Sequence, residues 1–125
     1  MNLEHVALSI RDRDEIEGFY QDILGMKLIR SFQLDKILAF DIFGMAENPE
    51  VFLLEKDQVQ FEIFLSPKRH PHGFDHICIS TAGRDEIMKK ARESSYRVFR
   101  QKRDHSDLVF ISDKNGNTFE VKKGE

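Results

Sequence analysis

Apolar and polar residues alternate along residues 3–10, a pattern that predicts a β-strand with His5 on its less apolar face. The spacing then changes to that of a helix, because the apolar residues of the segment 16–24 recur three and four positions apart. Gly25 follows directly and is expected to end this helix in a left-handed conformation. Residues 26–33 return to a strand pattern, so the chain is expected to begin as strand, helix and strand.

The segment 35–49 is compatible with two kinds of structure. Residues 38–42 alternate as in a strand, whereas the apolar residues between Asp35 and Gly44 suit a short helix. We favour the helix. Its side chains then either decorate the surface of the core or form the wall of a substrate pocket.

A predicted hairpin follows, with strands over residues 50–55 and 59–65. Glu62 lies on the second of these strands. Residues 67–73 contain two prolines and a glycine, which interrupt both helices and strands, so this segment is predicted to be a linker.

The second half of the chain follows the same plan. Its predicted elements are a strand with His76 over residues 74–80, a helix over 84–95, and strands over 97–102, 108–112 and 117–122. The last two strands are joined by a turn at Asn115-Gly116, a pair that readily supplies the positive φ of a tight hairpin.

The two halves are copies of one another. At an offset of 71 positions, residues 4–16 align with residues 75–87, and six of the thirteen pairs are identical, whereas chance gives about one. The later strands repeat at an offset of 58, which aligns Phe52 with Phe110. The first copy therefore carries about thirteen extra residues, which we assign to the segment 35–49.

Each copy has the element order βαβββ, which predicts an α+β fold built from two such modules. At 125 residues the chain is expected to be one compact domain. Its predicted parts are module one over residues 1–66 with a 13-residue insert near 35–49, a linker over 67–73 and module two over 74–125.

Composition narrows the range of partners. The net charge of −3 arises from mixed signs, so we expect no broad basic face for nucleic acid or for an acidic membrane surface. No apolar run reaches the roughly 18 residues of a membrane span, and no signal-peptide pattern is present, so a cytoplasmic location is expected. The lone Cys78 fits a reducing compartment.

Each copy runs from a strand histidine to a strand glutamate, which gives His5 and Glu62 in the first copy and His76 and Glu120 in the second. Glu62 stands between Phe61 and Ile63 on a largely apolar strand. A buried carboxylate without a partner costs several kcal/mol, so such a group has to be paired, ligated or neutral. Coordination of one divalent cation explains all four residues at once.

Two neutral imidazoles and two carboxylates balance the charge of a divalent cation, and this ligand set suits Zn, Ni, Co, Fe or Mn better than Mg or Ca. Such a cation can act as a Lewis acid on a small-molecule substrate that binds through two adjacent oxygens. It would stabilise the oxyanion that forms when a proton leaves the carbon next to a carbonyl. Glu62 and Glu120 are the candidate bases for that proton.

Other candidate groups carry weaker signals. His70 and His72 lie in the proline-containing linker, and His105 is flanked by charged residues, so all three are interpreted as loop histidines. Cys78 shares a strand face with His76, but an alanine holds its place in the first copy, so we interpret it as a small interior residue.

These residues resemble the motifs of the vicinal oxygen chelate superfamily, which includes glyoxalase I, bleomycin resistance proteins and dioxygenases. The resemblance covers essentially the whole chain and is carried by Leu3-Glu4-His5-Val6-Ala7, Phe19-Tyr20-Gln21-Asp22-Ile23-Leu24-Gly25-Met26-Lys27-Leu28, Phe61-Glu62-Ile63-Phe64, Phe74-Asp75-His76-Ile77 and Asp113-Lys114-Asn115-Gly116-Asn117-Thr118-Phe119-Glu120-Val121. It implies paired modules that wrap a cup-shaped, partly open barrel around the metal, commonly in a homodimer. Which chain's modules complete each cup varies within the family.

A glutamate at position 62 resembles glyoxalase I, the lactoylglutathione lyase, whereas epimerases of acyl-CoA tend to have glutamine there. The resemblance therefore implies proton transfer on a hemithioacetal or a related α-oxo compound. Ser9 departs from the bacterial glyoxalase I pattern, which usually has an arginine there that holds a glutathione carboxylate, so the thiol carrier stays open. The alternatives are a non-catalytic small-molecule binding module of the bleomycin-resistance kind and a metal-dependent acyl-CoA epimerase.

Overall fold

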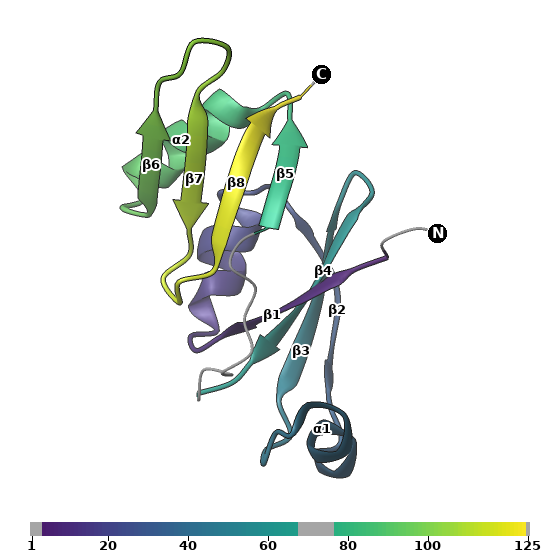
Figure 1. The fold of residues 1–125 in the computed structure, drawn as a ribbon. Coiled ribbons are helices and arrows are strands. Elements are labelled where there is room, and N and C mark those ends of the chain that lie inside the picture. The colour runs from purple at the N-terminus through teal and green to yellow at the C-terminus, as the bar shows by residue number, and fades with distance from the viewer. Residues whose placement is uncertain (1–3, 68–76, 125) are drawn as a thin grey trace.

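Two four-stranded sheets form the frame of the molecule (Figure 1). The computed structural model describes residues 4–67 and 77–124. The elements are β1 (Val6–Ile10), the short π-helix η1 (Ile16–Gln21), β2 (Lys27–Gln33), α1 (Lys36–Phe43), β3 (Glu50–Lys56), β4 (Val59–Leu65), β5 (Ile77–Thr81), α2 (Arg84–Glu93), β6 (Arg97–Gln101), β7 (Leu108–Ser112) and β8 (Thr118–Lys123). The first sheet has the order β1-β4-β3-β2 and the second the order β5-β8-β7-β6.

Strand pairing is the same in the two sheets. The first and last strands of each module are parallel neighbours, and the remaining pairs are antiparallel. This confirms the prediction of two βαβββ modules. The two sheets are separate and do not close into a barrel.

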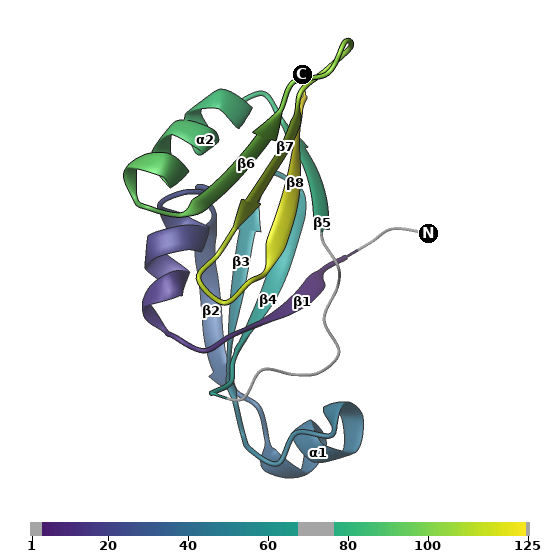
Figure 2. The same ribbon diagram turned by 60° about the vertical axis from the view of Figure 1, so that its left-hand side comes forward.

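The two modules share one hydrophobic core. Figure 2 shows α2 and the helical segment before β2 on the same side of the sheets, and their apolar side chains pack with those of both sheets in a single cluster. Phe61 of β4 and Phe119 of β8 meet there with ring centroids 5.6 Å apart. We call the opposite face of each sheet, which is turned away from this core, its open face. Because side chains alternate along a strand, Glu62 and Glu120 lie on the open faces.

The described helices are short, and none of them has the length and apolar character needed to cross a membrane. The first, η1, follows the predicted pattern of apolar residues, with Phe19 and Tyr20 both fully buried. The N–H of Asp22 bonds to the carbonyl of Glu17 at 2.9 Å, an i to i+5 bond, so the segment is wound as a π-helix. Gly25 follows it with φ of 73°, the left-handed conformation that the sequence predicted.

The insert of module one forms the helix α1, and the alternative strand for this segment is therefore wrong. The carboxylate of Asp35 caps the helix by accepting hydrogen bonds from the backbone N–H groups of Ile37 at 3.1 Å and Leu38 at 3.2 Å. Ala39 faces inward and packs in a small cluster at one end of the first sheet. Four large apolar side chains of α1 are exposed, namely Ile37, Leu38, Phe40 and Ile42. The insert is thus a surface element with an apolar outer side.

The modules differ by one residue in the hairpin that joins their last two strands. Phe52 of β3 lies in the shared core, and the matching core position of β7 is held by Val109 rather than Phe110. These strands therefore repeat at an offset of 57, and the predicted alignment of Phe52 with Phe110 is wrong by one residue. The cause is the turn: Lys56 pairs directly with Val59 in module one, whereas the turn of module two is one residue longer.

Two buried carboxylates bind the modules to each other. Glu15, only 3% exposed, accepts hydrogen bonds from the hydroxyl of Tyr96 at 2.6 Å and from the backbone N–H of Lys114 at 2.7 Å. Asp113, 5% exposed, accepts one from the hydroxyl of Tyr20 at 3.0 Å. Burial raises the pKa of both tyrosines above the ordinary value, so both hydroxyls remain donors well above neutral pH. The bonds of Lys114 and Asp113 fix the β7–β8 turn of module two against module one, and the bond of Tyr96 fixes the segment before β6.

Candidate metal centre

The open face of the first sheet carries the histidine and the glutamate of module one. β1 runs parallel to β4 with Ala7 in register with Glu62, and His5 lies just before β1 on the same face. His5 Nε2 is 3.5 Å from Glu62 Oε1. The two side chains are 43% and 25% exposed, so a small molecule can reach both from solvent.

The separation of these two atoms suits a shared cation. Two ligand atoms that each bond to one cation at about 2 Å lie roughly 3 Å apart, close to the spacing between His5 and Glu62. An imidazole nitrogen and a carboxylate oxygen are also the donors that transition metals accept readily. The residues present therefore fit one arm of the predicted centre.

Glu120 holds the equivalent position on the second sheet. It lies on β8 in register with Cys78 of β5 and Phe110 of β7, and its side chain is half-buried. Partial desolvation raises the pKa of the Cys78 thiol although the residue is exposed, and a hydrogen bond with Glu120 raises it further, so the thiol stays protonated near neutral pH and is a poor nucleophile. Cys78 is exposed, not interior as predicted, because the sheets leave this face open.

The structure does not bring all the predicted ligands together within the part of the chain that it describes. His76 lies outside the described residues, as do His70 and His72. Among residues 4–67 and 77–124, no three His, Cys, Asp or Glu side chains are close enough to hold a metal ion. Glu120 is thus not within ligand distance of the pair formed by His5 and Glu62 in one chain. The four-ligand centre stays a prediction.

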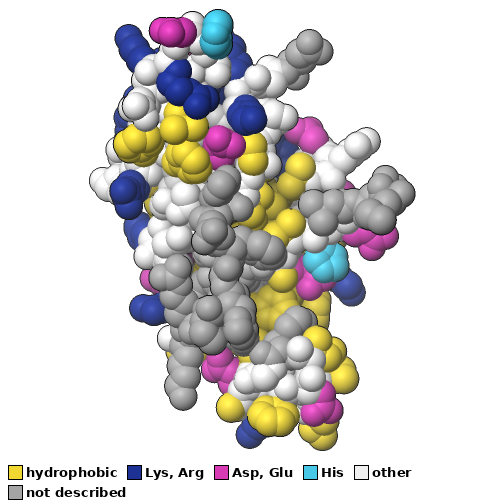
Figure 3. All heavy atoms as spheres, in the orientation of Figure 1, with side chains coloured by type: hydrophobic (Ala, Val, Ile, Leu, Met, Phe, Trp, Pro, Cys, Tyr) yellow, Lys and Arg dark blue, Asp and Glu magenta, His cyan; other side chains and the backbone are white. Residues whose placement is uncertain are grey.

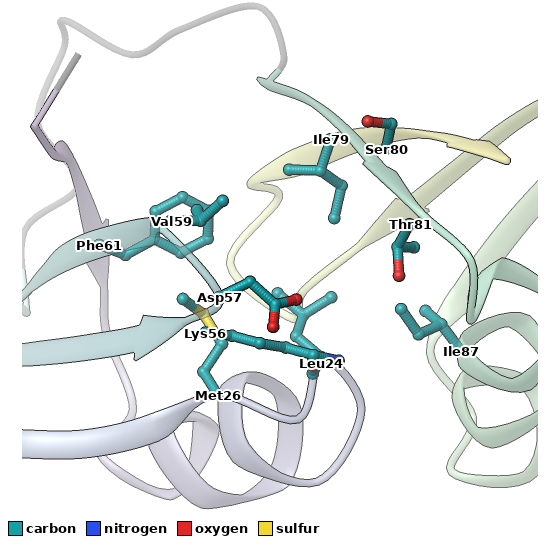
Figure 4. Close-up of a pocket in the computed structure, with 10 residues that line it drawn as sticks. All are labelled: Leu24, Met26, Lys56, Asp57, Val59, Phe61, Ile79, Ser80, Thr81 and Ile87. Atoms are coloured by element: carbon teal, nitrogen blue, oxygen red, sulfur yellow. The ribbon is translucent and has the colours of Figure 1, made fainter. Parts of the chain in front are cut away.

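A small pocket lies between the modules but apart from these residues (Figure 4). Its volume is about 50 Å³, and it is lined by Leu24, Met26, Lys56, Asp57, Val59, Phe61, Ile79, Ser80, Thr81 and Ile87. Lys56 Nζ donates a hydrogen bond to the carbonyl of Leu24 at 3.0 Å and thereby closes one side. The pocket is lined by none of the predicted ligands and holds only a few atoms, so it is not the candidate substrate site.

Sequence reasoning missed a buried arginine in module two. Arg84 begins α2, is 8% exposed and lines a pocket together with Glu120. Residues 84–87 repeat the sequence of residues 13–16, yet Arg13 is exposed and pairs with Glu50. The repeat therefore carried no signal that this arginine is buried.

Comparison with known proteins gives the family context. The sequence profile described as the Glyoxalase/Bleomycin resistance protein/Dioxygenase superfamily matches residues 4–111. A lactoylglutathione lyase of Arabidopsis thaliana is 27% identical over 122 residues, a match that covers 94% of this chain and 42% of that protein. A putative lactoylglutathione lyase of Brassica oleracea var. gemmifera is 26% identical with the same coverage. The chain thus spans less than half the length of these curated relatives.

Solved structures share the architecture. A glyoxalase family protein from Enterococcus faecalis superposes with a TM-score of 0.71 at 18% identity, covering 96% of this chain and 95% of that chain. A point mutant of the fosfomycin resistance protein FosX of Listeria monocytogenes, complexed with Mn(II) and 1S,2S-dihydroxypropylphosphonic acid, gives a TM-score of 0.75 at 16% identity, covering 99% of this chain and 93% of that chain. At these identities the likeness shows the fold alone.

Proposed function

This chain belongs to the glyoxalase, bleomycin resistance protein and dioxygenase superfamily, and from that premise we propose that it is a divalent-metal-dependent lyase or isomerase of the glyoxalase I type. Its substrate is a hemithioacetal or a related α-oxo compound. The observation that carries the proposal is the pair of His5 and Glu62, 3.5 Å apart on an open sheet face, with Glu120 at the equivalent position of the second module. The lactoylglutathione lyases among the relatives support it.

The cation, one of Zn, Ni, Co, Fe or Mn, is held in this proposal by His5, Glu62, His76 and Glu120. When bound, it supplies Lewis acidity toward the oxygens of the substrate. A carboxylate, from Glu62 or Glu120, takes the proton from the carbon that bears the sulfur and returns it to the neighbouring carbonyl carbon. The partial exposure of Glu62 supports this role, because the base has to reach the substrate.

We further propose that the centre is assembled across a homodimer. Within the described part of one chain, Glu120 does not join His5 and Glu62 in a cluster of three possible ligands. A second copy can bring its module-two arm to the module-one arm of the first. In such a dimer the two chains are related by a two-fold axis, and module one of each chain meets module two of the other.

Metal analysis and turnover test the proposed function together. We expect purified protein to carry about one transition metal per site and to convert an adduct of methylglyoxal with a thiol. Glu62→Gln and Glu120→Gln are each expected to lose the metal and to lower turnover by at least about 100-fold, because each removes a ligand and a candidate base. Glu93→Gln, an exposed position on α2, is the matched control and is expected to keep both.

The choice of thiol belongs in the same experiment, because Ser9 replaces the arginine that holds a glutathione carboxylate in bacterial glyoxalase I. Glutathione, coenzyme A and small neutral thiols are therefore compared as carriers. Full activity in both glutamine variants would refute the proposal. Ligand binding by metal-free protein without turnover of any adduct would instead support the binding-module alternative.

A further inference from the structure

A second pocket, larger than the one between the modules, opens at the far end of the second sheet. Its volume is about 570 Å³, and it is bounded by the start of α2, the β6–β7 loop and the ends of β7 and β8. Figure 3 shows Lys and Arg side chains gathered over this end of the molecule, at the top of the view. The pocket also includes Glu120, so it adjoins the candidate metal centre.

The charge of this pocket is opposite to that of the whole chain. Four cationic side chains line it, namely Arg84, Arg103, Lys122 and Lys123, against the carboxylates of Asp107 and Glu120. The negative charge of Asp107 is already balanced by Arg100, a residue that does not line the pocket. Arg100 Nε donates a hydrogen bond to the Asp107 carboxylate at 2.7 Å and lowers the pKa of that carboxyl. The chain as a whole carries −3, so the local excess of positive charge is a feature of this site.

Arg84 is the buried member of this group. Arg84 is 8% exposed, and its Nε atom is buried with no hydrogen-bond partner among the described residues. Its described polar contacts are a hydrogen bond from Nη1 to the carbonyl oxygen of Asp107 at the long distance of 3.5 Å and an ion pair at 3.8 Å with the exposed Asp85. A guanidinium has five N–H donors, and burying them without acceptors is costly. The buried Nε therefore lacks an acceptor among the described residues.

We propose that this pocket binds an anion, the carboxylate or phosphate group of a small molecule, with Arg84 as the buried anchor. The planar guanidinium pairs with two oxygens of such a group. The exposed Arg103 and Lys122 complete the charge at the mouth. Because Glu120 borders the same pocket, the anion lies on the substrate itself, and this assignment of the source rests on the proposed function.

Binding of inorganic phosphate tests the pocket without any need for turnover. Backbone amide NMR shifts of the full chain are followed during titration with phosphate at constant ionic strength. We expect saturable shifts at Arg84, in residues 103–109 and in residues 120–123. Arg103→Gln and Lys122→Gln are each expected to weaken binding by about fivefold or more, since each removes a charge-assisted contact. Lys27→Gln, an exposed lysine on the first sheet, is the charge-matched control.

Arg84→Lys keeps the charge but loses the planar fork, and it is expected to weaken phosphate binding as well. Should this buried position fail to tolerate substitution, the two exposed variants still decide the question. Shifts that rise linearly without saturation, or equal losses in Lys27→Gln and Arg103→Gln, would mean general charge screening and would overturn the anion site.

Turnover distinguishes the two sources of the anion. If the anion is part of the substrate, phosphate is a competitive inhibitor of turnover. Arg103→Gln then raises KM for an adduct of a carboxylate-bearing thiol. The same variant leaves KM for an adduct of a neutral thiol unchanged, and kcat for both adducts stays the same. If phosphate binds without competing with either adduct, the assignment to the substrate is overturned and the pocket takes a free anion. Saturable phosphate binding in a protein without turnover would separate failure of the proposed function from failure of the pocket.

Discussion

Glu15 is held by one side-chain donor and one backbone donor, and it lies almost fully inside the protein. Asp113 has more hydrogen-bond donors than Glu15. Its carboxylate accepts hydrogen bonds from the hydroxyl of Tyr20, from the backbone N–H of Asn115, and from both the backbone and the side chain of Asn117. The two tyrosines therefore make unequal contributions. Removing one of two hydrogen-bond donors destabilises a buried carboxylate more than removing one of four.

Tyr96→Phe is accordingly expected to lower the free energy of unfolding by about 2 kcal/mol, because it leaves buried Glu15 with a single donor. Tyr20→Phe is the matched variant and is expected to cost about 1 kcal/mol, since Asp113 keeps its other donors. Urea unfolding at neutral pH measures both values. Equal losses in the two variants would show that donor number at the carboxylate does not set the cost.

The same four residue types, Arg-Asp-Glu-Ile, occupy residues 13–16 and 84–87, and their environments are reversed. In module one Glu15 is buried and Arg13 exposed, whereas in module two Arg84 is buried and Glu86 exposed. The spacing of apolar residues predicted a helix at each of these sites, and the structure confirms both. The sequence could not predict the burial, because Glu15 is covered by residues of the other module and Arg84 lies beside the distant β6–β7 loop of its own module.

At the scale of elements, α1 depends on its cap more than on packing. Ala39 anchors it to the first sheet, while its other large apolar side chains that the structure describes are exposed. Most helices are held by an amphipathic face, and α1 has little of one. The two N–H groups that Asp35 satisfies are therefore a large part of what keeps the first turn formed.

Asp35→Ala is expected to destabilise α1 by about 1 kcal/mol and so to speed amide hydrogen exchange in residues 37–43 by about fivefold. Asp41→Ala, an exposed position in the same helix, is the control and is expected not to speed exchange, because alanine is the better helix former. Exchange followed by mass spectrometry measures both. Unchanged exchange in Asp35→Ala would show that contacts other than the cap hold the helix.

The strands show where a repeat alignment stops being informative. Identity at an offset of 58 placed Phe52 over Phe110, but alternation puts Phe52 and Val109 in the core. A single extra residue in a turn shifts one strand by one position and moves every side chain of that strand to the other face. The sequence of β7 could not show this, because its first four residues are all apolar, and only the burial and the pairing with β8 fix the register.

At the scale of the whole molecule, the sequence predicted two βαβββ modules and the two glutamates on strands, whereas His5 lies just before β1 and not on the strand as predicted. The sequence could not predict how the sheets stand relative to each other. That arrangement depends on a shared core, in which Phe61 meets Phe119, and on hydrogen bonds between modules such as that from Tyr96 to Glu15. As a result, the separation of Glu120 from His5 and Glu62 within one chain emerged only from the structure.

Complementation between two inactive variants decides whether the proposed centre is shared by two chains. An equimolar, subunit-exchanged mixture of Glu62→Gln and Glu120→Gln is expected to recover about one quarter of wild-type turnover, because half of the dimers are mixed and each mixed dimer has one intact centre of two. Glu62→Gln mixed with His5→Gln is the control. Both changes damage the same arm, so every centre in that mixture remains defective whichever chains combine. If each centre is instead built inside one chain, both mixtures stay inactive, because every chain then carries a damaged ligand set. That result would contradict assembly across the dimer. The proposed chemistry would still be tested separately, by the metal analysis.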